Sequence, residues 1–465
     1  MPLAADYFTR GEQSLLKQDP RPQCKKPFSE KNQGMQAFAV QQFQPAAQHF
    51  QDAINLFKRA PRECYVDPET LIFLNNAKAN QGNPITIAAV IPTNGQDLYN
   101  DRSQEMLRGV AHVQDNFNQN KGIKGRLLQV IIARDDNDVE IGKRVAKHLG
   151  DNKIPGDSFK GEVLGVVGPF TSDVALYSGK VYETQQLVAV SPVSTADRQP
   201  KRSQSGYEFD LSKYVFRTAP SNSVAAEKLF QYSQTIHGSE QPAIIYDSQQ
   251  SYSLSLKDAF ERKFPGQQVI SCDIYGTHVV DCISQASNAK FLMLALGSAS
   301  AKQASEAIDL NLKKLPLLGG DALYSDDKLS SEVKGDNAEN MVLAVSSHID
   351  IFTMLFKEES NKFWRTKSVG WRTAATYDAA EAVVEALRQN PTRNGLYNTL
   401  SSPNFSVSSS SLNFPVDGTT APVQFDNLHD RKINHKIGVL VQVKKQCTPN
   451  DNDNQKYKFC LLQNY

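Results

Sequence analysis

From residue 85 onward, short apolar segments alternate with longer amphipathic stretches, and this alternation constrains the fold more than any other feature of the chain. Residues 106–117 have apolar side chains at helical spacing, and the Gly-containing segment 121–125 ends that stretch. Apolar runs of strand length lie at 85–91, 127–133, 163–168 and 187–190. Such alternation predicts parallel strands connected by crossover helices on both faces of a sheet.

A second set of the same kind follows Tyr214–Thr218. Its predicted strands are 243–246, 268–270, 291–295 and 317–319, with helices between them. A chain of 465 residues is too long for one ordinary core. We therefore expect an α/β fold with two doubly wound, Rossmann-like lobes. Ligands of such sheets bind beyond the carboxyl ends of the strands, so two facing lobes would enclose a cleft.

The first 83 residues have a different pattern and are predicted to be helical. Small and aromatic residues from Gly34 to Ala53 recur at offsets that match one tetratricopeptide-like unit, and Asp67-Pro68-Glu69 is typical of a helix start. One such repeat is not stable alone, so it should dock on the next domain or be held by a Cys24–Cys64 bond. The region is either a partner-binding module or a structural cap, and we favour the cap.

Six cysteines fall into three local pairs: Cys24 with Cys64, Cys272 with Cys282, and Cys447 with Cys460. The turn-forming segment 448–454 lies between the last two and would bring their sulfurs together. No cysteine–histidine cluster has zinc-ligand spacing. The alternatives are six free thiols in the cytoplasm or three disulfides in an oxidising compartment, and the pairing favours disulfides.

Charge and hydropathy exclude several classes of function. With 51 basic and 50 acidic side chains, no global field favours nucleic acid or an anionic membrane. No apolar stretch approaches the roughly 20 residues of a membrane helix, and the first residues lack the pattern of a signal peptide. The chain is thus either cytoplasmic or exported by a segment outside this sequence, which would also supply any membrane anchor.

Polar residues at the predicted strand ends are the candidate binding groups. Ser172 would sit at a helix N-terminus, where a hydroxyl and free backbone N–H groups suit a carboxylate. Residues 191–195 follow the next strand, and Asp321 follows Gly319-Gly320 in the second set. A serine or aspartate at a helix start is more often a plain N-cap. Together, however, these clusters offer an anion site and a cation site, as a zwitterionic amino acid requires.

From about residue 84 to the end, the chain resembles the type I periplasmic ligand-binding fold, and in particular the branched-chain-type amino-acid-binding proteins of ABC transporters. The resemblance covers some four-fifths of the chain in family order. It is carried by residues 85–91, 107–110, 122–125, 135–138, 167–172, 191–195, 214–220, 246–247, 252–253, 317–321 and 374–380. The repeat-like helices and Leu74-Asn75-Asn76-Ala77 are similar to a cyanobacterial subgroup of that family.

The resemblance implies a role for each matching position. Ser172 would hold the ligand carboxylate, and Val193 and Thr195 the head group. Tyr252 would close over the ligand and Asp321 would receive its ammonium. Phe170 would line the side-chain pocket, which Ser298 would leave wide. Arg102 falls near a family aromatic position: if it enters the cleft, an acidic or polar ligand is favoured over leucine, and otherwise it is a solvated surface arginine.

The resemblance also implies a division of the chain and a hinge. Residues 84–217 and 346–415 would form the first lobe, and 218–345 and 416–465 the second. The chain would cross between lobes near 217–220, 344–348 and 412–420, and the lobes would close around ligand.

The sequence therefore predicts an extracytoplasmic, periplasmic solute-binding protein that delivers an amino acid to an ABC-transporter permease. The alternative is the ligand-sensing ectodomain of a membrane receptor, which would use the same cleft. An enzyme is disfavoured because the chain has no GxSxG, HExxH or Walker motif. The segment 135–140 lacks the glycine and distal glutamate of a calcium loop, so we expect no metal and no cofactor.

Overall fold

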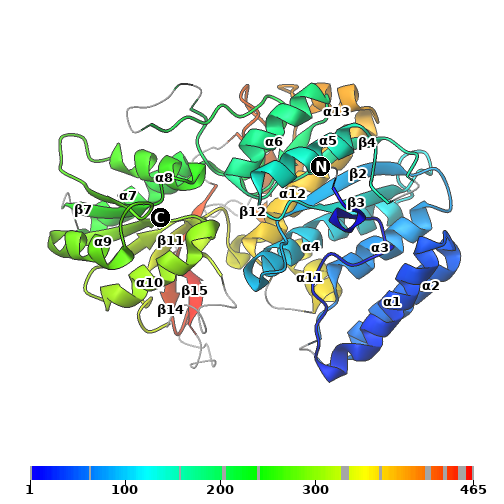
Figure 1. Ribbon diagram of the computed structural model, residues 1–465, viewed down its shortest axis with the longest axis horizontal. Coiled ribbons are helices and arrows are strands. Elements are labelled where there is room, and N and C mark those ends of the chain that lie inside the picture. Colours follow the sequence, from blue (N-terminus) through cyan, green and yellow to red (C-terminus); the bar gives the residue numbers. More distant parts are fainter. Residues whose placement is uncertain are drawn as a thin grey trace.

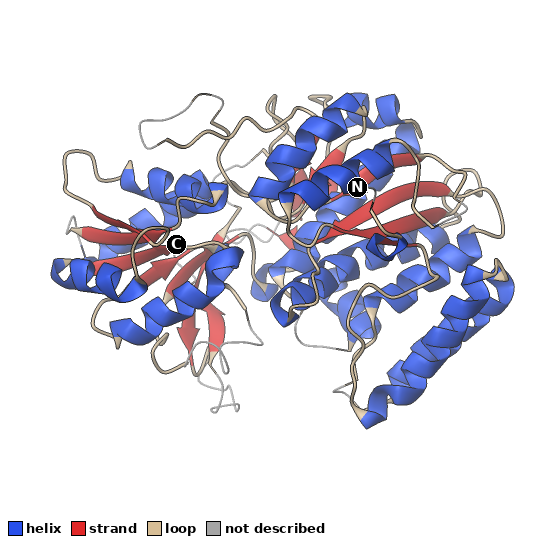
Figure 2. Cartoon of the chain, in the orientation of Figure 1, coloured by secondary structure: helices blue, strands red, loops and turns tan. Residues whose placement is uncertain are grey.

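Two sheets, each covered by helices on both faces, form two lobes side by side (Figures 1 and 2). The computed structural model describes residues 3–61, 64–156, 159–199, 201, 206–237, 241–325, 335–365, 369–413, 420–432, 437–448 and 457–462. None of the described helices is long and apolar enough to cross a membrane. The mixed α/β architecture with parallel sheets agrees with the fold class expected from the sequence.

The first lobe contains a sheet in the order β1-β3-β2-β4-β5-β6. All neighbours pair in parallel except β1, which pairs antiparallel with β3 at the edge. Its strands are β1 (Phe8–Thr9), β2 (Ile85–Ile91), β3 (Leu128–Arg134), β4 (Val163–Val167), β5 (Ala189–Ser191) and β6 (Val215–Arg217). Its helices are α4 (Asp97–Gln119), α5 (Val139–Gly150), α6 (Ser172–Thr184), α11 (Met354–Trp364), α12 (Trp371–Gln389) and α13 (Arg393–Leu400).

The second lobe contains a sheet in the order β15-β14-β11-β10-β9-β7-β8, parallel from β11 to β8 and antiparallel at β14 and β15. Its strands are β7 (Pro242–Tyr246), β8 (Ile270–Asp273), β9 (Phe291–Ala295), β10 (Leu317–Gly319), β11 (Val342–Val345), β14 (Val439–Lys444) and β15 (Lys458–Leu461). Its helices are α7 (Asn222–His237), α8 (Ser251–Glu261), α9 (Val279–Gln285) and α10 (Ala301–Asn311). Short 3-10 turns lie at Ala5–Tyr7, Pro22–Cys24, Ala286–Asn288, Ser298–Ser300, Asp321–Leu323 and Ile349–Ile351.

The chain returns to the second sheet later than the boundary at residue 416 expected from the sequence. Strand β12 (Val407–Asn413) packs on α12 and pairs antiparallel with β13 (Thr420–Val423). Asp430 then forms a bridge with Arg217 at the end of β6, and the guanidinium of Arg431 lies 2.8 Å from the Asp378 carboxylate of α12. Residues 420–431 therefore belong with the first lobe. Most of the expected crossing at 412–420 lies outside the described residues.

The N-terminal region contains three helices, α1 (Lys25–Ala39), α2 (Phe43–Arg59) and α3 (Pro68–Ala79). Helices α1 and α2 pack side by side at the outer edge of the first lobe (Figure 1). Gly34 makes their close approach possible, because a Cβ there would lie 2.6 Å from the Phe50 ring. The expectation of an entirely helical region was wrong for its first 20 residues. These contain β1, because the open edge of β3 offers backbone groups to pair with.

Helix α3 docks the N-terminal region on the first sheet. The Asn76 side chain accepts a hydrogen bond from the Val130 N–H at 2.8 Å and donates to the Val130 carbonyl at 2.7 Å, so it pairs with β3 as a neighbouring strand would. It also donates to the Arg10 carbonyl at 2.6 Å. Asn75, the other polar residue of the buried segment Leu74-Asn75-Asn76-Ala77, donates to Asp115 Oδ1 at 3.0 Å.

A buried ionic cluster holds the first residues against these helices. Lys31 Nζ of α1 lies 2.6 Å from both Asp67 Oδ2 and Glu69 Oε2, and the side chains of Lys31 and Glu69 are almost completely buried. Glu69 Oε1 accepts hydrogen bonds from the backbone N–H groups of Leu15 (2.7 Å) and Leu16 (3.1 Å). We call Lys31, Asp67 and Glu69 the Lys31 cluster.

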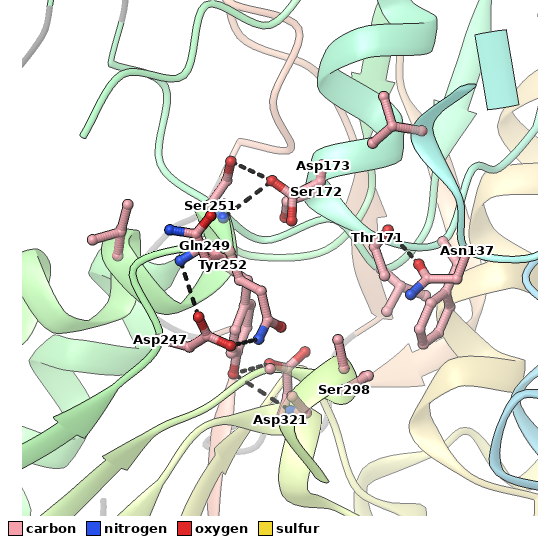
Figure 3. Close-up of a pocket in the computed structure, with 18 of the residues that line it drawn as sticks. Asn137, Thr171, Ser172, Asp173, Asp247, Gln249, Ser251, Tyr252, Ser298 and Asp321 are labelled. Carbon is pink, nitrogen blue, oxygen red and sulfur yellow. Dashed lines mark hydrogen bonds between the residues drawn. The ribbon is translucent and has the colours of Figure 1, made fainter. Parts of the chain in front are cut away.

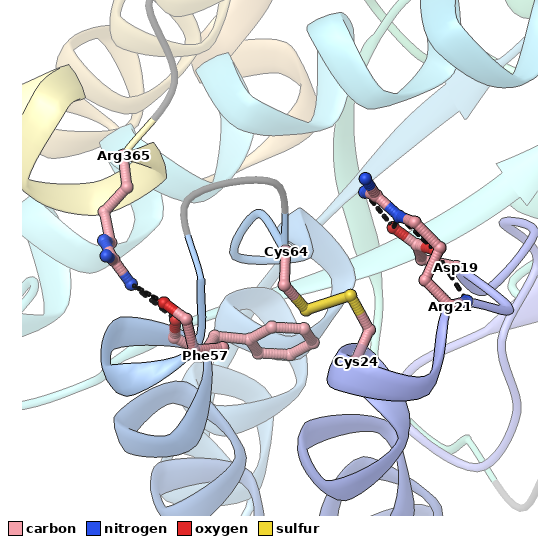
Figure 4. Close-up of a disulfide and its surroundings, with 7 residues drawn as sticks. Asp19, Arg21, Cys24, Phe57, Cys64 and Arg365 are labelled. Atoms are coloured by element: carbon pink, nitrogen blue, oxygen red, sulfur yellow. Dashed lines mark hydrogen bonds and ion pairs between the residues drawn. A yellow bond between two sulfur atoms is a disulfide. The ribbon is translucent and has the colours of Figure 1, made fainter.

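Three disulfides are present, and they are the three pairs expected from the sequence: Cys24–Cys64, Cys272–Cys282 and Cys447–Cys460. Cys24–Cys64 joins the start of α1 to the segment after α2 (Figure 4). Nearby, Arg365 at the end of α11 donates to the Phe57 carbonyl at 2.8 Å, which ties α2 to the first lobe. Most of the turn expected at 448–454 lies outside the described residues.

Candidate functional site

A cavity of about 560 Å³ lies where the strand-end loops of the two lobes face each other. Its walls come from the loops that follow β3, β4 and β5 of the first lobe, the start of α12, and the loops that follow β7, β9 and β10 of the second. These loops lie at the carboxyl ends of parallel strands, where ligands of doubly wound sheets bind. The volume is within the range of small-ligand pockets.

Five of the residues expected to bind ligand line this one cavity: Phe170, Ser172, Val193, Tyr252 and Asp321. Ser298 also lines it. Figure 3 shows Ser172 on the first-lobe side and Tyr252 with Asp321 on the second-lobe side. The two candidate poles, a hydroxyl at a helix start and a carboxylate, therefore border a shared space.

Ser172 is the first residue of α6, and other first-lobe loops hold its hydroxyl. Its Oγ accepts hydrogen bonds from the Ser194 hydroxyl (3.2 Å) and the Ala196 N–H (3.3 Å). Gly168 at the end of β4 allows the loop to enter here, since its φ is +122° and a Cβ would lie 2.5 Å from the Val90 carbonyl oxygen. Thr171, Ser172 and Asp173 at the start of α6 line the cavity, and the N-terminus of a helix is suited to an anion.

Asp321 and Tyr252 form the opposite wall. The Tyr252 hydroxyl donates to Asp321 Oδ1 at 2.8 Å, and only 8% of Asp321 is exposed. Burial raises the pKa of Asp321, while the Tyr252 hydrogen bond and the Arg372 guanidinium act in the opposite direction. Burial and the neighbouring Asp321 charge raise the pKa of Tyr252, so the phenol stays neutral as a donor. A cationic group placed here would compensate the desolvated carboxylate.

Thr195 lies beside this cavity rather than in its wall. With Asp321 it lines an adjoining small cavity of about 20 Å³, and its hydroxyl is buried without a hydrogen-bond partner among the described residues. Asp321 therefore borders both spaces.

Arg102 neither enters the cleft nor lies on the solvated surface, the two alternatives that the sequence left open. It is 4% exposed, does not line the cavity between the lobes, and donates to the Tyr324 carbonyl at 2.9 Å. The reason is its place on α4, one turn before Glu105, whose carboxylate lies 3.4 Å away and holds the guanidinium beneath the loop after β10. Arg102 thus links the lobes instead of contacting solvent or the cavity.

Arg372 is the arginine that reaches the cavity, and it was not predicted. It is the second residue of α12, is 1% exposed, and donates to the carbonyls of Asp321 (3.0 Å) and Tyr324 (3.2 Å). None of the described residues accepts a hydrogen bond from its buried Nε. Burial lowers its pKa to about 10. One feature of the sequence could have identified Arg372: it is a charged residue in the first turn of a helix that is otherwise almost completely buried.

Two further acidic residues, Asp173 and Asp247, line the cavity and were also missed. Asp173 Oδ1 accepts hydrogen bonds from the Ser251 N–H (3.1 Å) and hydroxyl (2.5 Å), so a first-lobe side chain binds the start of α8 in the second lobe (Figure 3). Asp197 makes a similar link, accepting from the Ser223 N–H at 3.0 Å and donating its own N–H to the Ser255 hydroxyl at 2.8 Å. The sequence did offer a signal for both residues: Asp247 directly follows the strand predicted at 243–246, and Asp173 follows Ser172 at the expected helix start.

Gly320 keeps the Tyr252–Asp321 pair in place, and its replacement by alanine is expected to cost about 1–3 kcal/mol of folding stability. A Cβ at this position would lie 2.1 Å from the Tyr252 hydroxyl oxygen and 2.7 Å from Leu256. Chemical denaturation of Gly320→Ala measures the loss. Gly276→Ala is the control, since a Cβ there meets nothing within 4 Å. Equal stability of the two variants would contradict this prediction.

The fold and the cavity define a two-lobed solute-binding protein, and comparison with known proteins gives the same class. Residues 84–448 match the family model of the periplasmic binding proteins. The chain belongs to this family, whose members bind solutes and are not enzymes. None of the curated protein sequences matches the chain.

Several solved structures share the fold at low sequence identity. A leucine-binding protein from Thermotoga maritima is 16% identical with a TM-score of 0.61, over 81% of this chain and 97% of that protein. A branched-chain amino-acid-binding protein from Streptococcus pneumoniae, in complex with isoleucine, is 14% identical with a TM-score of 0.63, over 82% and 99%. A solute-binding protein from Rhodopseudomonas palustris, in complex with 3,4-dihydroxybenzoic acid, is 15% identical with a TM-score of 0.61, over 82% and 97%.

Proposed function

We propose that this protein captures a free amino acid in the cavity between its lobes, in the periplasm, and delivers it to the permease of an ABC transporter. The observation that carries the proposal is the shared cavity between the first turn of α6 and the Tyr252–Asp321 pair. An α-amino acid carries its carboxylate and its ammonium on the same carbon atom. The start of α6 is suited to bind the carboxylate, and the Asp321 carboxylate is suited to bind the ammonium.

The fold relatives support this choice without fixing the ligand. The Thermotoga maritima protein is named as a leucine-binding protein, and the Streptococcus pneumoniae protein contains isoleucine. The Rhodopseudomonas palustris protein contains an aromatic acid instead. The buried carboxylate of Asp321 favours a ligand with an ammonium over a plain carboxylic acid, because an anion placed beside it would be repelled. The three disulfides suit an oxidising compartment.

Thermal unfolding in the presence of each of the twenty amino acids tests the proposal. A ligand at 100 times its dissociation constant stabilises the folded state by about 2.7 kcal/mol, which a melting curve detects. We expect at least one amino acid to stabilise the wild type, and Asp321→Asn to reduce its affinity by about 100-fold, since the variant keeps the shape but loses the charge. Stabilisation by none of the twenty, or an equal response of Asp321→Asn, would disprove the assignment.

A further inference from the structure

The charge of the cavity wall narrows the class of ligand. Three of the described lining residues are acidic, Asp173, Asp247 and Asp321, and Arg372 is the one basic residue among them. An amino acid with a neutral side chain carries no net charge and would leave this imbalance uncorrected.

The charges around Asp321 balance one another. Arg372 Nη1 lies 3.3 Å and Arg102 Nη1 3.4 Å from Glu105 Oε2, so two guanidinium groups share one carboxylate. Asp321 supplies the second negative charge, and both arginines act to lower its pKa. The head group of an amino acid is itself neutral overall, so its binding at this end of the cavity keeps the balance.

Asp173 and Asp247 have no such compensation. Asp173 accepts hydrogen bonds only from Ser251 among the described residues, and only through Oδ1. Asp247 accepts from the Gln249 N–H (3.0 Å), the Ser300 hydroxyl (2.6 Å) and the Gln250 amide. All of these donors are neutral. Asp173 contacts Ser251, four residues after Asp247, so the two carboxylates border the same part of the cavity. Burial raises the pKa of Asp173, the Ser251 hydrogen bonds act in the opposite direction, and the like charge of Asp247 raises it further.

These two carboxylates come from opposite lobes, Asp173 from the first turn of α6 and Asp247 from the loop after β7. A cation bound between them would be attracted to both carboxylates. The amide side chains of Asn137, Gln249 and Gln250 line the same cavity, so its wall beside the two carboxylates is polar rather than apolar.

We infer that the ligand is an amino acid with a cationic side chain, of the lysine, ornithine or arginine type, whose terminal cation binds between Asp173 and Asp247. Its head group lies between α6 and Asp321, and Phe170 and Leu254 cover its methylene groups. The inference rests on the proposed function and specifies the substrate class of the same site.

Arginine and citrulline provide the sharpest comparison, because citrulline has nearly the same shape without the charge. Titration calorimetry of the wild type with arginine, lysine, citrulline, leucine and glutamate measures the selectivity. We expect arginine or lysine to bind about 100-fold or more tightly than citrulline, leucine and glutamate. The affinity for the cationic ligand should also fall as salt concentration rises.

The variants Asp173→Asn and Asp247→Asn locate the site of the cation. Each should weaken binding of the basic amino acid by about tenfold or more and leave the affinity for citrulline nearly unchanged. Asp281→Asn removes a charge from an exposed position on α9 and should change neither affinity. Melting temperatures of the free variants establish that they are folded.

The outcomes separate the two proposals. If citrulline, leucine or glutamate binds as tightly as arginine and lysine, or if both variants keep the preference for the cation, the inference is wrong and the proposed function stands. If no amino acid binds, the proposed function fails and the inference fails with it.

Discussion

Replacing Lys31 with methionine is expected to lower the free energy of unfolding by about 3–5 kcal/mol, because it leaves the carboxylate of Glu69 buried without its cation. Lys31 and Glu69 are both almost completely buried, and their charged atoms lie 2.6 Å apart. Methionine preserves the length and apolar volume of the side chain, so the loss of stability measures the effect of removing the positive charge. Chemical denaturation followed by circular dichroism measures it.

Two companion variants make this prediction specific. Lys26→Met places the same substitution on an exposed position of α1 and should cost less than about 0.5 kcal/mol. In Lys31→Met with Glu69→Gln, the glutamine still accepts hydrogen bonds from Leu15 and Leu16 but carries no charge, so much of the stability should return. A double variant as unstable as Lys31→Met alone would show that lost packing, rather than the unpaired charge, causes the effect.

Asp135→Asn is expected to stabilise the protein at pH 8 and to have little effect below pH 4. Burial raises the pKa of Asp135 to about 7, and its Oδ2 has no partner among the described residues. Between pH 4 and 7 the folded state therefore retains a proton that the unfolded state releases, and wild-type stability falls as the pH rises through this range. Each pKa unit corresponds to about 1.4 kcal/mol. Above pH 7, the free energy of unfolding of Asp135→Asn should therefore exceed that of the wild type by up to about 4 kcal/mol.

Denaturation of both proteins at pH 4, 6 and 8 tests this expectation. Asparagine retains the Oδ1 that accepts the Asn137 N–H at 2.8 Å, so the loop beside the cavity should keep its shape. Asp281→Asn, at an exposed position, should show no such pH dependence. A stability difference between Asp135→Asn and wild type that is the same at all three pH values would contradict the assignment of the titrating group.

The sequence predicted the sheets well because their signal is local. Buried parallel strands such as Ile85–Ile91 and Phe291–Ala295 are continuous apolar runs bounded by turn residues, and the helices between them show their own period. Strand β1 has only two residues, which is too short for any periodic pattern. It is a strand because β3 offers it an edge, a property of the assembled lobe. The position of β13 likewise depends on its pairing with β12.

The same difference between local sequence patterns and tertiary packing explains which residues of the site could be predicted. The positions after strand ends were predictable, since parallel strands bring their carboxyl ends to one edge. Which arginine reaches the cavity was not, because that depends on how α4 packs on α12. Gly109 permits a very close approach of the two helices, where a Cβ would lie 2.6 Å from the Thr373 carbonyl. In this arrangement Arg372 faces the cavity and Arg102 lies behind it. The roles of Ser172, Val193, Thr195 and Asp321 stay predictions until ligand is bound.

The first and last strands of the described chain belong to different lobes: β1 is the outer strand of one sheet and β15 the outer strand of the other. Fluorescent donor and acceptor groups attached beside these two strands would report any motion of the lobes that changes the distance between the strands. Neither strand lines the cavity, so the labels would not replace any residue of its wall. Energy transfer between them would convert solute capture into an optical signal, so the architecture is suited to use as a biosensor.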